Sequence, residues 1–88
     1  MISSASIKDK YPSNIGIVLC GHGSRDPNAV KEFINVVDKI KSRIPNIPVA
    51  FGFLEFNRPI IGAALDQLRN MGVERVIALP AMLFAAGH

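Results

Sequence analysis

Three residues that can bind a metal ion or accept a proton are spaced evenly along the 88-residue chain: His22, Glu55 and His88. Neutral imidazole nitrogens and carboxylate oxygens suit borderline divalent ions such as cobalt, nickel, iron and zinc. Imidazole also accepts protons near neutral pH, since histidine in free peptides titrates at about pH 6.5. A site that gathered all three side chains would bind a divalent metal ion and take up protons.

The spacing alone leaves a second interpretation open, in which each residue has an ordinary structural role. His22 would then hydrogen-bond within its own loop, Glu55 would be a solvated charge at a helix start, and His88 would be a frayed chain end. The sequence contains no short His-x-x-x-His motif that would decide in favour of a metal site.

The stretch Ile15-Gly-Ile-Val-Leu-Cys-Gly-His-Gly-Ser-Arg-Asp-Pro27 determines where His22 lies. Its first part, residues 15–20, is apolar and rich in β-branched side chains, which predicts a strand buried on both faces of a parallel α/β sheet. Gly21 and Gly23 flank His22, and glycine tolerates a positive φ angle or the close approach of another group. Ligands bind beyond the carboxyl ends of the strands in such sheets, so His22 is a candidate site residue.

A helix is predicted after this loop, beginning at Pro27 with Asp26 as its N-cap. Its apolar residues recur at spacings of three and four, and charged residues occupy the other face. The apolar positions are Val30, Phe33, Ile34, Val37, Ile40 and Ile44. Pro45 and Pro48 end the helix, and the apolar, aromatic stretch 49–53 predicts a second strand.

The second strand is followed by a loop that holds Glu55, then by a second helix and a third strand. Pro59 suits the first position of this helix, and Gly72 suits its C-terminal stop. Residues 73–80 form the third predicted strand. Right-handed crossovers place the strands in the order 2-1-3 or 3-2-1, with all carboxyl ends at one edge. We therefore expect an α/β fold, a three-layer βαβαβ unit with a parallel sheet, that brings the three candidate side chains to one edge.

Length and composition fit one apolar-rich domain, with 49% hydrophobic residues and a mean hydropathy of +0.27. Residues 1–14 are polar and predict a flexible leader, so that residues 15–88 form the domain. The formal net charge of +3 is spread along the chain without a Lys/Arg cluster, which argues against nucleic acid as a partner. The longest apolar run, residues 76–86, is interrupted by Pro80 and is too short to span a membrane.

The lone Cys20 excludes an internal disulfide and fits a reducing, cytoplasmic compartment. We expect it to be a small core residue of the buried strand. A nucleotide site is disfavoured, because Asp26 stands where a dinucleotide-binding loop has its third glycine and the lysine of a phosphate loop is missing. Ser24 and Arg25 can hold a carboxylate or phosphate near the helix start, the alternative being a capping serine and an exposed arginine.

Three blocks of the sequence are more specific in combination and in this order than any one of them alone. They are Leu19-Cys-Gly-His-Gly-Ser-Arg-Asp-Pro27, Gly52-Phe-Leu-Glu55 and Pro80-Ala-Met-Leu-Phe-Ala-Ala-Gly-His88. Together they resemble the small sirohydrochlorin cobaltochelatase family of class II tetrapyrrole chelatases. The resemblance covers residues 15–88. It implies ATP-independent insertion of Co²⁺, with Fe²⁺ or Ni²⁺ in relatives, into sirohydrochlorin on the path to cobalamin or a related tetrapyrrole.

By this resemblance, His22 and His88 match the family's paired histidines, which hold the incoming metal and help to take the pyrrole protons. Glu55 matches an acidic position in the family's second loop, and we expect it to support catalysis. Arg25 and Arg58 suit the carboxylates of the substrate. The divalent metal is itself a substrate, and no nucleotide is implied.

Family members continue beyond the second histidine into a helix, a fourth strand and a final helix, whereas this chain stops at His88. We therefore expect a sheet that is truncated after its third strand and that leaves an edge exposed. The resemblance implies a homodimer or a domain completed by another chain. Two alternatives to the metal-inserting lyase stay open: a non-catalytic metal- or tetrapyrrole-binding module, and an inactive fragment of a chelatase.

Overall fold

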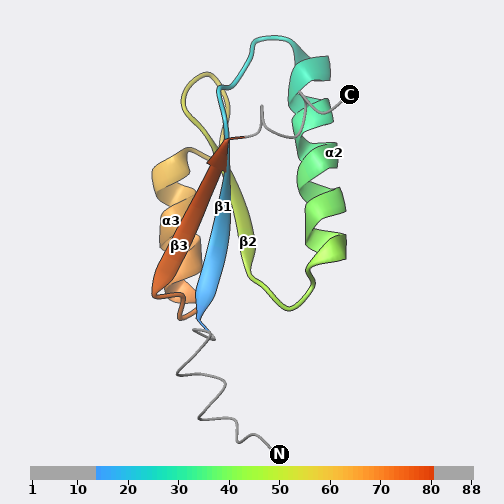
Figure 1. The fold of residues 1–88 in the computed structure, drawn as a ribbon. Coiled ribbons are helices and arrows are strands. Elements are labelled where there is room, and N and C mark those ends of the chain that lie inside the picture. Colours follow the sequence, from blue (N-terminus) through green and yellow to red (C-terminus); the bar gives the residue numbers. More distant parts are fainter. Residues whose placement is uncertain (1–13, 81–88) are drawn as a thin grey trace, which may run out of the picture.

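The computed structural model describes residues 14–80, which form strand, helix, strand, helix and strand in chain order (Figure 1). The elements are β1 (Ile15–Gly21), α2 (Pro27–Arg43), β2 (Val49–Phe53), α3 (Ile61–Asn70) and β3 (Arg75–Pro80). The leader predicted for residues 1–14 lies outside the described residues except for Asn14, and so does His88. The βαβαβ order is the one that the sequence predicts.

The three strands form a parallel sheet in the order β2-β1-β3, one of the two orders expected for right-handed crossovers. β1 is the central strand, and its Val18 lies opposite Ala50 of β2 and Ala78 of β3. Because all strands run in the same direction, their carboxyl ends meet at one edge. The loops that follow β1 and β2 lie side by side there (Figure 1).

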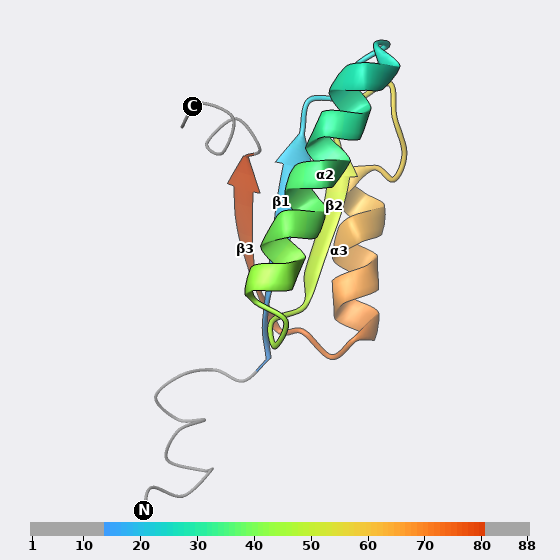
Figure 2. The ribbon, with the colours of Figure 1, turned by 90° about the vertical axis from the view of Figure 1, so that its right-hand side faces the viewer.

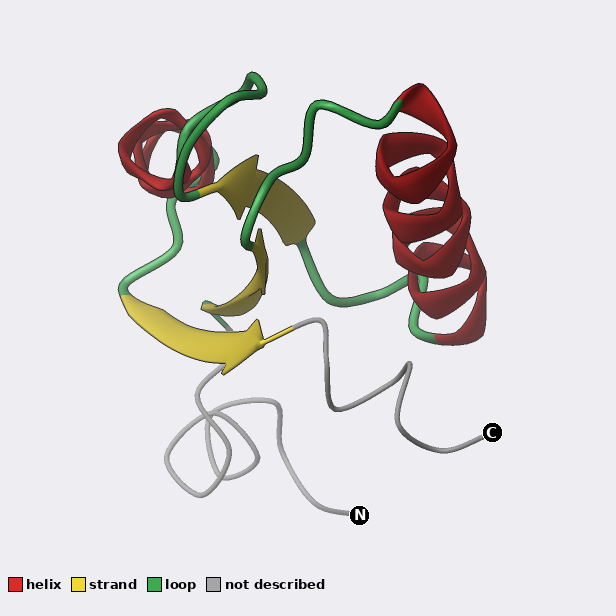
Figure 3. Ribbon diagram, turned by 90° about the horizontal axis from the view of Figure 1, so that it is seen from above, coloured by secondary structure: helices red, strands yellow, loops and turns green. Residues whose placement is uncertain are grey.

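Helix α2 covers one face of the sheet and α3 the other, so the domain has the three layers that the sequence predicts (Figures 2 and 3). The N-cap of α2 is Asp26, whose Oδ1 accepts a hydrogen bond from the Asn28 N–H at 3.0 Å, and Pro27 is the first helical residue. Neither helix among residues 14–80 has the length and apolar character needed to cross a bilayer.

The core under α2 is built on the buried residues Leu19, Val37 and Val49. Half-buried apolar residues pack around them, namely Ile17, Phe33, Ile40, Ile44, Phe51 and Leu79. Val37 has no exposed surface. This packing confirms the apolar stripe predicted for the helix, because its positions of spacing three and four share one face.

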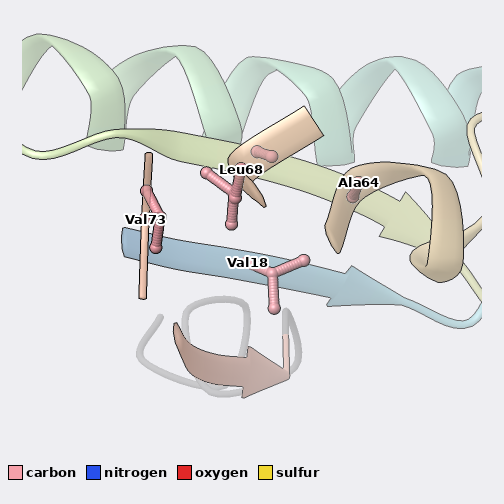
Figure 4. Packing of buried hydrophobic residues seen from close by; sticks show 5 residues of the cluster. Val18, Ala64, Leu68 and Val73 are labelled. Atoms are coloured by element: carbon pink, nitrogen blue, oxygen red, sulfur yellow. The ribbon is translucent and has the colours of Figure 1, made fainter. Parts of the chain in front are cut away.

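The core on the opposite face lies between the sheet and α3 (Figure 4). It contains Val18, Ala50, Ala64, Leu68 and Val73. Leu68 is completely buried, and Val18 exposes only 1% of its surface. Since Val18 and its neighbour in β1, Leu19, point to opposite faces, the central strand is buried on both sides as predicted.

The start of α3 differs from the sequence prediction, which places Pro59 at the first helical position. The helix begins instead at Ile61, with Ile60 as an N-cap that makes no side-chain capping bond. The carbonyl oxygen of Pro59 accepts a hydrogen bond from the Phe53 N–H at 2.8 Å and so continues the strand geometry. The prediction is wrong because proline fits the end of an extended connection as well as a helix start. The predicted stop is confirmed: Gly72, with a φ of +86°, follows the last turn of α3.

β3 is the least covered strand among the described residues. It begins at Arg75 rather than at the predicted Val73, and every residue in it except Leu79 is exposed. Val76 and Ile77, which point to opposite faces, expose 40% and 45% of their surface. Apolar edge strands are normally paired or covered in folded proteins, and within residues 14–80 β3 is paired on one side only, with β1.

We expect Gly52→Ala to destabilise the domain by about 1 to 3 kcal/mol, because it overpacks the contact between β2 and α3. A Cβ atom at Gly52 would lie 2.6 Å from the Cα atom of Ile61 and 2.8 Å from its N atom, and neither backbone atom can rotate away. Urea unfolding measures the loss.

Gly62→Ala is the matched control, since a Cβ atom there meets nothing within 4 Å and helices favour alanine over glycine. It should leave stability unchanged or raise it. Equal stabilities of the two variants would contradict a close approach of α3 to β2.

Candidate functional site

The pairing of β1 with β2 continues beyond the ends of both strands. The N–H of Leu54 donates to the carbonyl oxygen of Gly21 at 2.9 Å, and the N–H of Glu55 donates to that of His22 at 3.2 Å. The structure therefore brings together the backbones of His22 and Glu55, two of the three candidate residues. Both residues are exposed, so their side chains are accessible to a ligand. His88, the third candidate, lies outside the described residues.

A second link between the two loops is made by the side chain of Asn57. Its Oδ1 accepts a hydrogen bond from the Ser24 N–H at 2.6 Å. Between these links lies Gly23, with a φ of +92°, and the carbonyl oxygen of Glu55 occupies the space that a Cβ atom of residue 23 would need. Glycine is therefore required at this position, because a side chain would force the loops apart.

Ser24 and Arg25 have distinct surroundings at the start of α2. The Oγ of Ser24 accepts a hydrogen bond from the Asp26 N–H at 3.0 Å, which is the capping role that the sequence left open. Arg25 is exposed, and its guanidinium lies over the ring of Phe56, with Cζ 5.0 Å from the ring centroid. This distance is typical of a cation–π interaction. Ser24 thus shapes the loop, while Arg25 is the exposed cation that it carries.

Two neighbouring hollows open at this edge. The smaller, of about 180 Å³, is lined by the His22 loop, the first turns of α2, and Phe53. Its apolar floor belongs to a cluster of three phenylalanines, Phe33, Phe51 and Phe53, whose ring centroids lie 5.0, 5.9 and 6.0 Å apart. The larger hollow, of about 600 Å³, is lined by Ser24, Arg25, Pro27, Val30, Phe56 and Asn57. Ser24 and Val30 line both hollows, so the two adjoin.

The donors for a metal ion are only partly described. Within residues 14–80, no group of three or more His, Cys, Asp or Glu side chains is arranged to hold a metal ion. His22 is the exposed imidazole at the edge of the smaller hollow. The predicted ligand pair of His22 and His88 stays a prediction, because only one member of it is described.

Cys20 takes no part in this edge. Its side chain packs against the core under α3, and its Sγ lies 4.0 Å from the carbonyl oxygen of Val18. Burial raises the pKa of the Cys20 thiol above its ordinary value, because the apolar surroundings disfavour the thiolate. The thiol is therefore a neutral, half-buried packing group, as the sequence predicts.

Sequence reasoning assigned no role to two residues that shape this edge, Phe56 and Asn57. Asparagine in a loop often bonds to nearby backbone, which is a signal that could have drawn attention to Asn57. Phe56 has a φ of +70°, and nothing in the sequence indicates that a phenylalanine would adopt this conformation. Both contacts reach from the second loop to the first, so they are visible only in the folded chain.

Comparison with known proteins gives this arrangement a family. The sequence pattern of the CbiX family matches residues 16–88, which include both loops and His88. The chain belongs to the CbiX family. Its glycine-flanked histidine and its βαβαβ order are therefore features of a CbiX-family chain.

This CbiX-family chain is 42% identical over 74 residues to the sirohydrochlorin cobaltochelatase of Methanothermobacter thermautotrophicus, covering 84% of this chain and 51% of that protein. It is 36% identical over 72 residues to the sirohydrochlorin cobaltochelatase of Methanococcus maripaludis, covering 82% and 50%. The crystal structure of a CbiX protein from Marinobacter aquaeolei matches the fold with a TM-score of 0.66 at 24% identity, covering 75% of this chain and 52% of that one. The chain spans about half the length of the relatives it matches.

We expect Asn57→Ala to lower the free energy of unfolding by about 1 kcal/mol, because the Ser24 N–H loses its acceptor. Asn57→Asp is the matched variant, since a carboxylate oxygen can accept the same hydrogen bond. Urea unfolding and amide exchange at Ser24 check the prediction. An unchanged exchange rate at Ser24 in Asn57→Ala would show that this bond does not hold the loops together.

We expect Cys20 to react with iodoacetamide at a higher pH in the folded chain than in the urea-unfolded chain, because only the thiolate reacts. The folded state disfavours that thiolate, so stability is fully retained below the pKa of the unfolded thiol and declines as the pH rises above it. Alkylation rates measured between about pH 7 and pH 10 should place the unfolded midpoint near the ordinary value of about 8.5 and the folded midpoint above it. Equal alkylation midpoints in the folded and the unfolded chain would show that folding does not desolvate the thiol.

Proposed function

We propose that this chain acts in the insertion of Co²⁺ into sirohydrochlorin, as all or part of an ATP-independent metallochelatase, with Fe²⁺ or Ni²⁺ as further possible metals. The observation that carries the proposal is the exposed His22 at the edge of an apolar hollow, next to the loop of Glu55. Membership of the CbiX family and identity to two named sirohydrochlorin cobaltochelatases support it. We infer that the reaction takes place in the cytoplasm, on the path to cobalamin or a related tetrapyrrole.

The chemistry of insertion requires three things of the protein. The metal ion must lose part of its water shell, it must be delivered to the ring nitrogens, and the ring must release two N–H protons, so that charge balances when Co²⁺ enters. Neutral imidazoles meet the first and third requirements, because their nitrogens bind borderline metals and accept protons. We assign these roles to His22 and His88, and a supporting role in proton uptake to Glu55.

Binding of the organic substrate is assigned to the two hollows and to polar side chains of the loops around them. The phenylalanine side chains of the smaller hollow offer an apolar surface to part of a macrocycle. Ser24, Arg25 and the exposed Arg58 suit its peripheral carboxylates. The exposed strand β3 supports assembly as a homodimer or with another chain that covers this edge.

A second function is tested beside the first, because the activity is named only for relatives of which this chain spans about half. The chain would then be a metal- or tetrapyrrole-binding module without turnover. Incubation of the 88-residue chain with sirohydrochlorin and excess Co²⁺, followed by the absorbance of the tetrapyrrole, separates the two functions. Multiple turnovers support the chelatase, whereas a change that stops at one equivalent supports the module.

We expect His22→Ala and His88→Ala each to weaken Co²⁺ binding by more than about tenfold, since losing even an outer-shell partner of a ligand costs 10- to 100-fold. The double variant should lose less than the sum of the two losses in free energy, because the first substitution already dismantles a shared site. Calorimetric titration with Co²⁺ measures all four proteins.

Gln67→Ala, an exposed substitution on α3, is the control and should bind Co²⁺ as the unchanged chain does. Additive losses for the two histidines would reject a shared metal site. Unchanged affinity in His22→Ala would return that residue to the role of a loop histidine.

A further inference from the structure

Phe56 combines three unusual properties for a loop residue. Its backbone has a φ of +70°, its side chain is 58% exposed, and its ring lies beneath the guanidinium of Arg25. Residues other than glycine, asparagine and aspartate rarely adopt positive φ, and such strained positions concentrate at functional sites. A glycine at position 56 would adopt this φ without strain. The backbone conformation therefore gives no reason for a phenylalanine there.

The ring is placed where a ligand would meet it. Phe56, Arg25 and Asn57 line the larger hollow, which adjoins the hollow of His22 through Ser24 and Val30. Beyond its backbone pairing, the second loop reaches across the edge of the sheet and contacts the first loop through two side chains. One is the Asn57 bond to the Ser24 N–H, and the other is the ring of Phe56 against Arg25.

The contact determines which groups Arg25 can bind. A guanidinium that rests with one face on an aromatic ring keeps the N–H donors in its plane free for a carboxylate. The adjacent carboxylate of Asp26 is engaged on the helix side, since its Oδ1 accepts the Asn28 N–H as the cap of α2. Arg25 is therefore held at the hollow as a donor for an anion from outside.

We propose that Phe56 is a positioning residue, which holds Arg25 so that its N–H donors receive a peripheral carboxylate of the tetrapyrrole while the metal enters at His22. This inference rests on the proposed function and adds the residue that makes the site select macrocycles with free carboxylates. Without the ring, Arg25 is a mobile surface cation that attracts anions without orienting them. The effect of Phe56 on binding is thus exerted through Arg25.

The test titrates the 88-residue chain with metal-free sirohydrochlorin and follows the fluorescence of the tetrapyrrole. Arg25→Gln should weaken binding roughly tenfold, as expected for loss of a charge-assisted hydrogen bond. Phe56→Gly should weaken it about three- to fivefold through loss of the cation–π contact. Phe56→Tyr retains an aromatic face and should restore binding. In the Arg25→Gln background, Phe56→Gly should have no further effect.

Urea unfolding of the same variants separates positioning from a structural role. Phe56→Gly should be at least as stable as the unchanged chain, because glycine is at ease at this φ, yet it should bind more weakly. Leu54→Ala is the control, since Leu54 is 61% exposed in the same loop and lines neither hollow. A fully esterified sirohydrochlorin should bind the unchanged chain and Phe56→Gly equally.

Each outcome bears on one proposal or the other. If the unchanged chain binds sirohydrochlorin and Phe56→Gly binds it equally well, Phe56 is not a positioning residue and the proposed function stands. If Phe56→Gly loses affinity equally with and without Arg25, the ring acts independently and the inference is again overturned. If the unchanged chain does not bind sirohydrochlorin at all, the proposed function fails, and the inference fails with it.

Discussion

The site depends on the parallel pairing of β1 with β2. Parallel strands need a crossover that returns the chain to its starting end, and α2 provides it, so that both loops emerge at the same edge. The pairing then continues through Gly21 and His22 to Leu54 and Glu55. The N–H groups of the second loop donate to the carbonyl oxygens of the first. These hydrogen bonds hold two loops that are far apart in the sequence in one arrangement.

Two cores hold this pairing in place from opposite faces. Val18 packs beneath α3 and Leu19 beneath α2, and both are almost completely buried. The rigid centre allows the edge to carry exposed polar groups and a strained residue, as functional loops on a fixed scaffold commonly do. An apolar floor, an accessible imidazole and an exposed cation then lie close together, and the proposed function uses all three.

Much of the fold was predictable because its signals are local. Apolar residues at spacings of three and four define α2, and Asp26 with Pro27 marks its start. The apolar run before His22 identifies a central strand. The start of α3 was not predictable, because the hydrogen bond from Phe53 to Pro59, which keeps the chain extended, joins a strand end to a later turn. The strand order was narrowed to two possibilities, since both satisfy right-handed crossovers.

The sequence by itself determined that His22 would stand at the carboxyl end of a buried strand and that Glu55 would follow the next one, because glycines and apolar periodicity act within a few residues. β2 neighbours β1 in both expected strand orders, and only the tertiary structure decided that β1 is the central strand. The tertiary structure also decided how the loops after β1 and β2 meet, through the contacts of Phe56 with Arg25 and of Asn57 with Ser24. They form between residues far apart in the chain, so no local pattern encodes them, and they exist only once both faces of the sheet are packed.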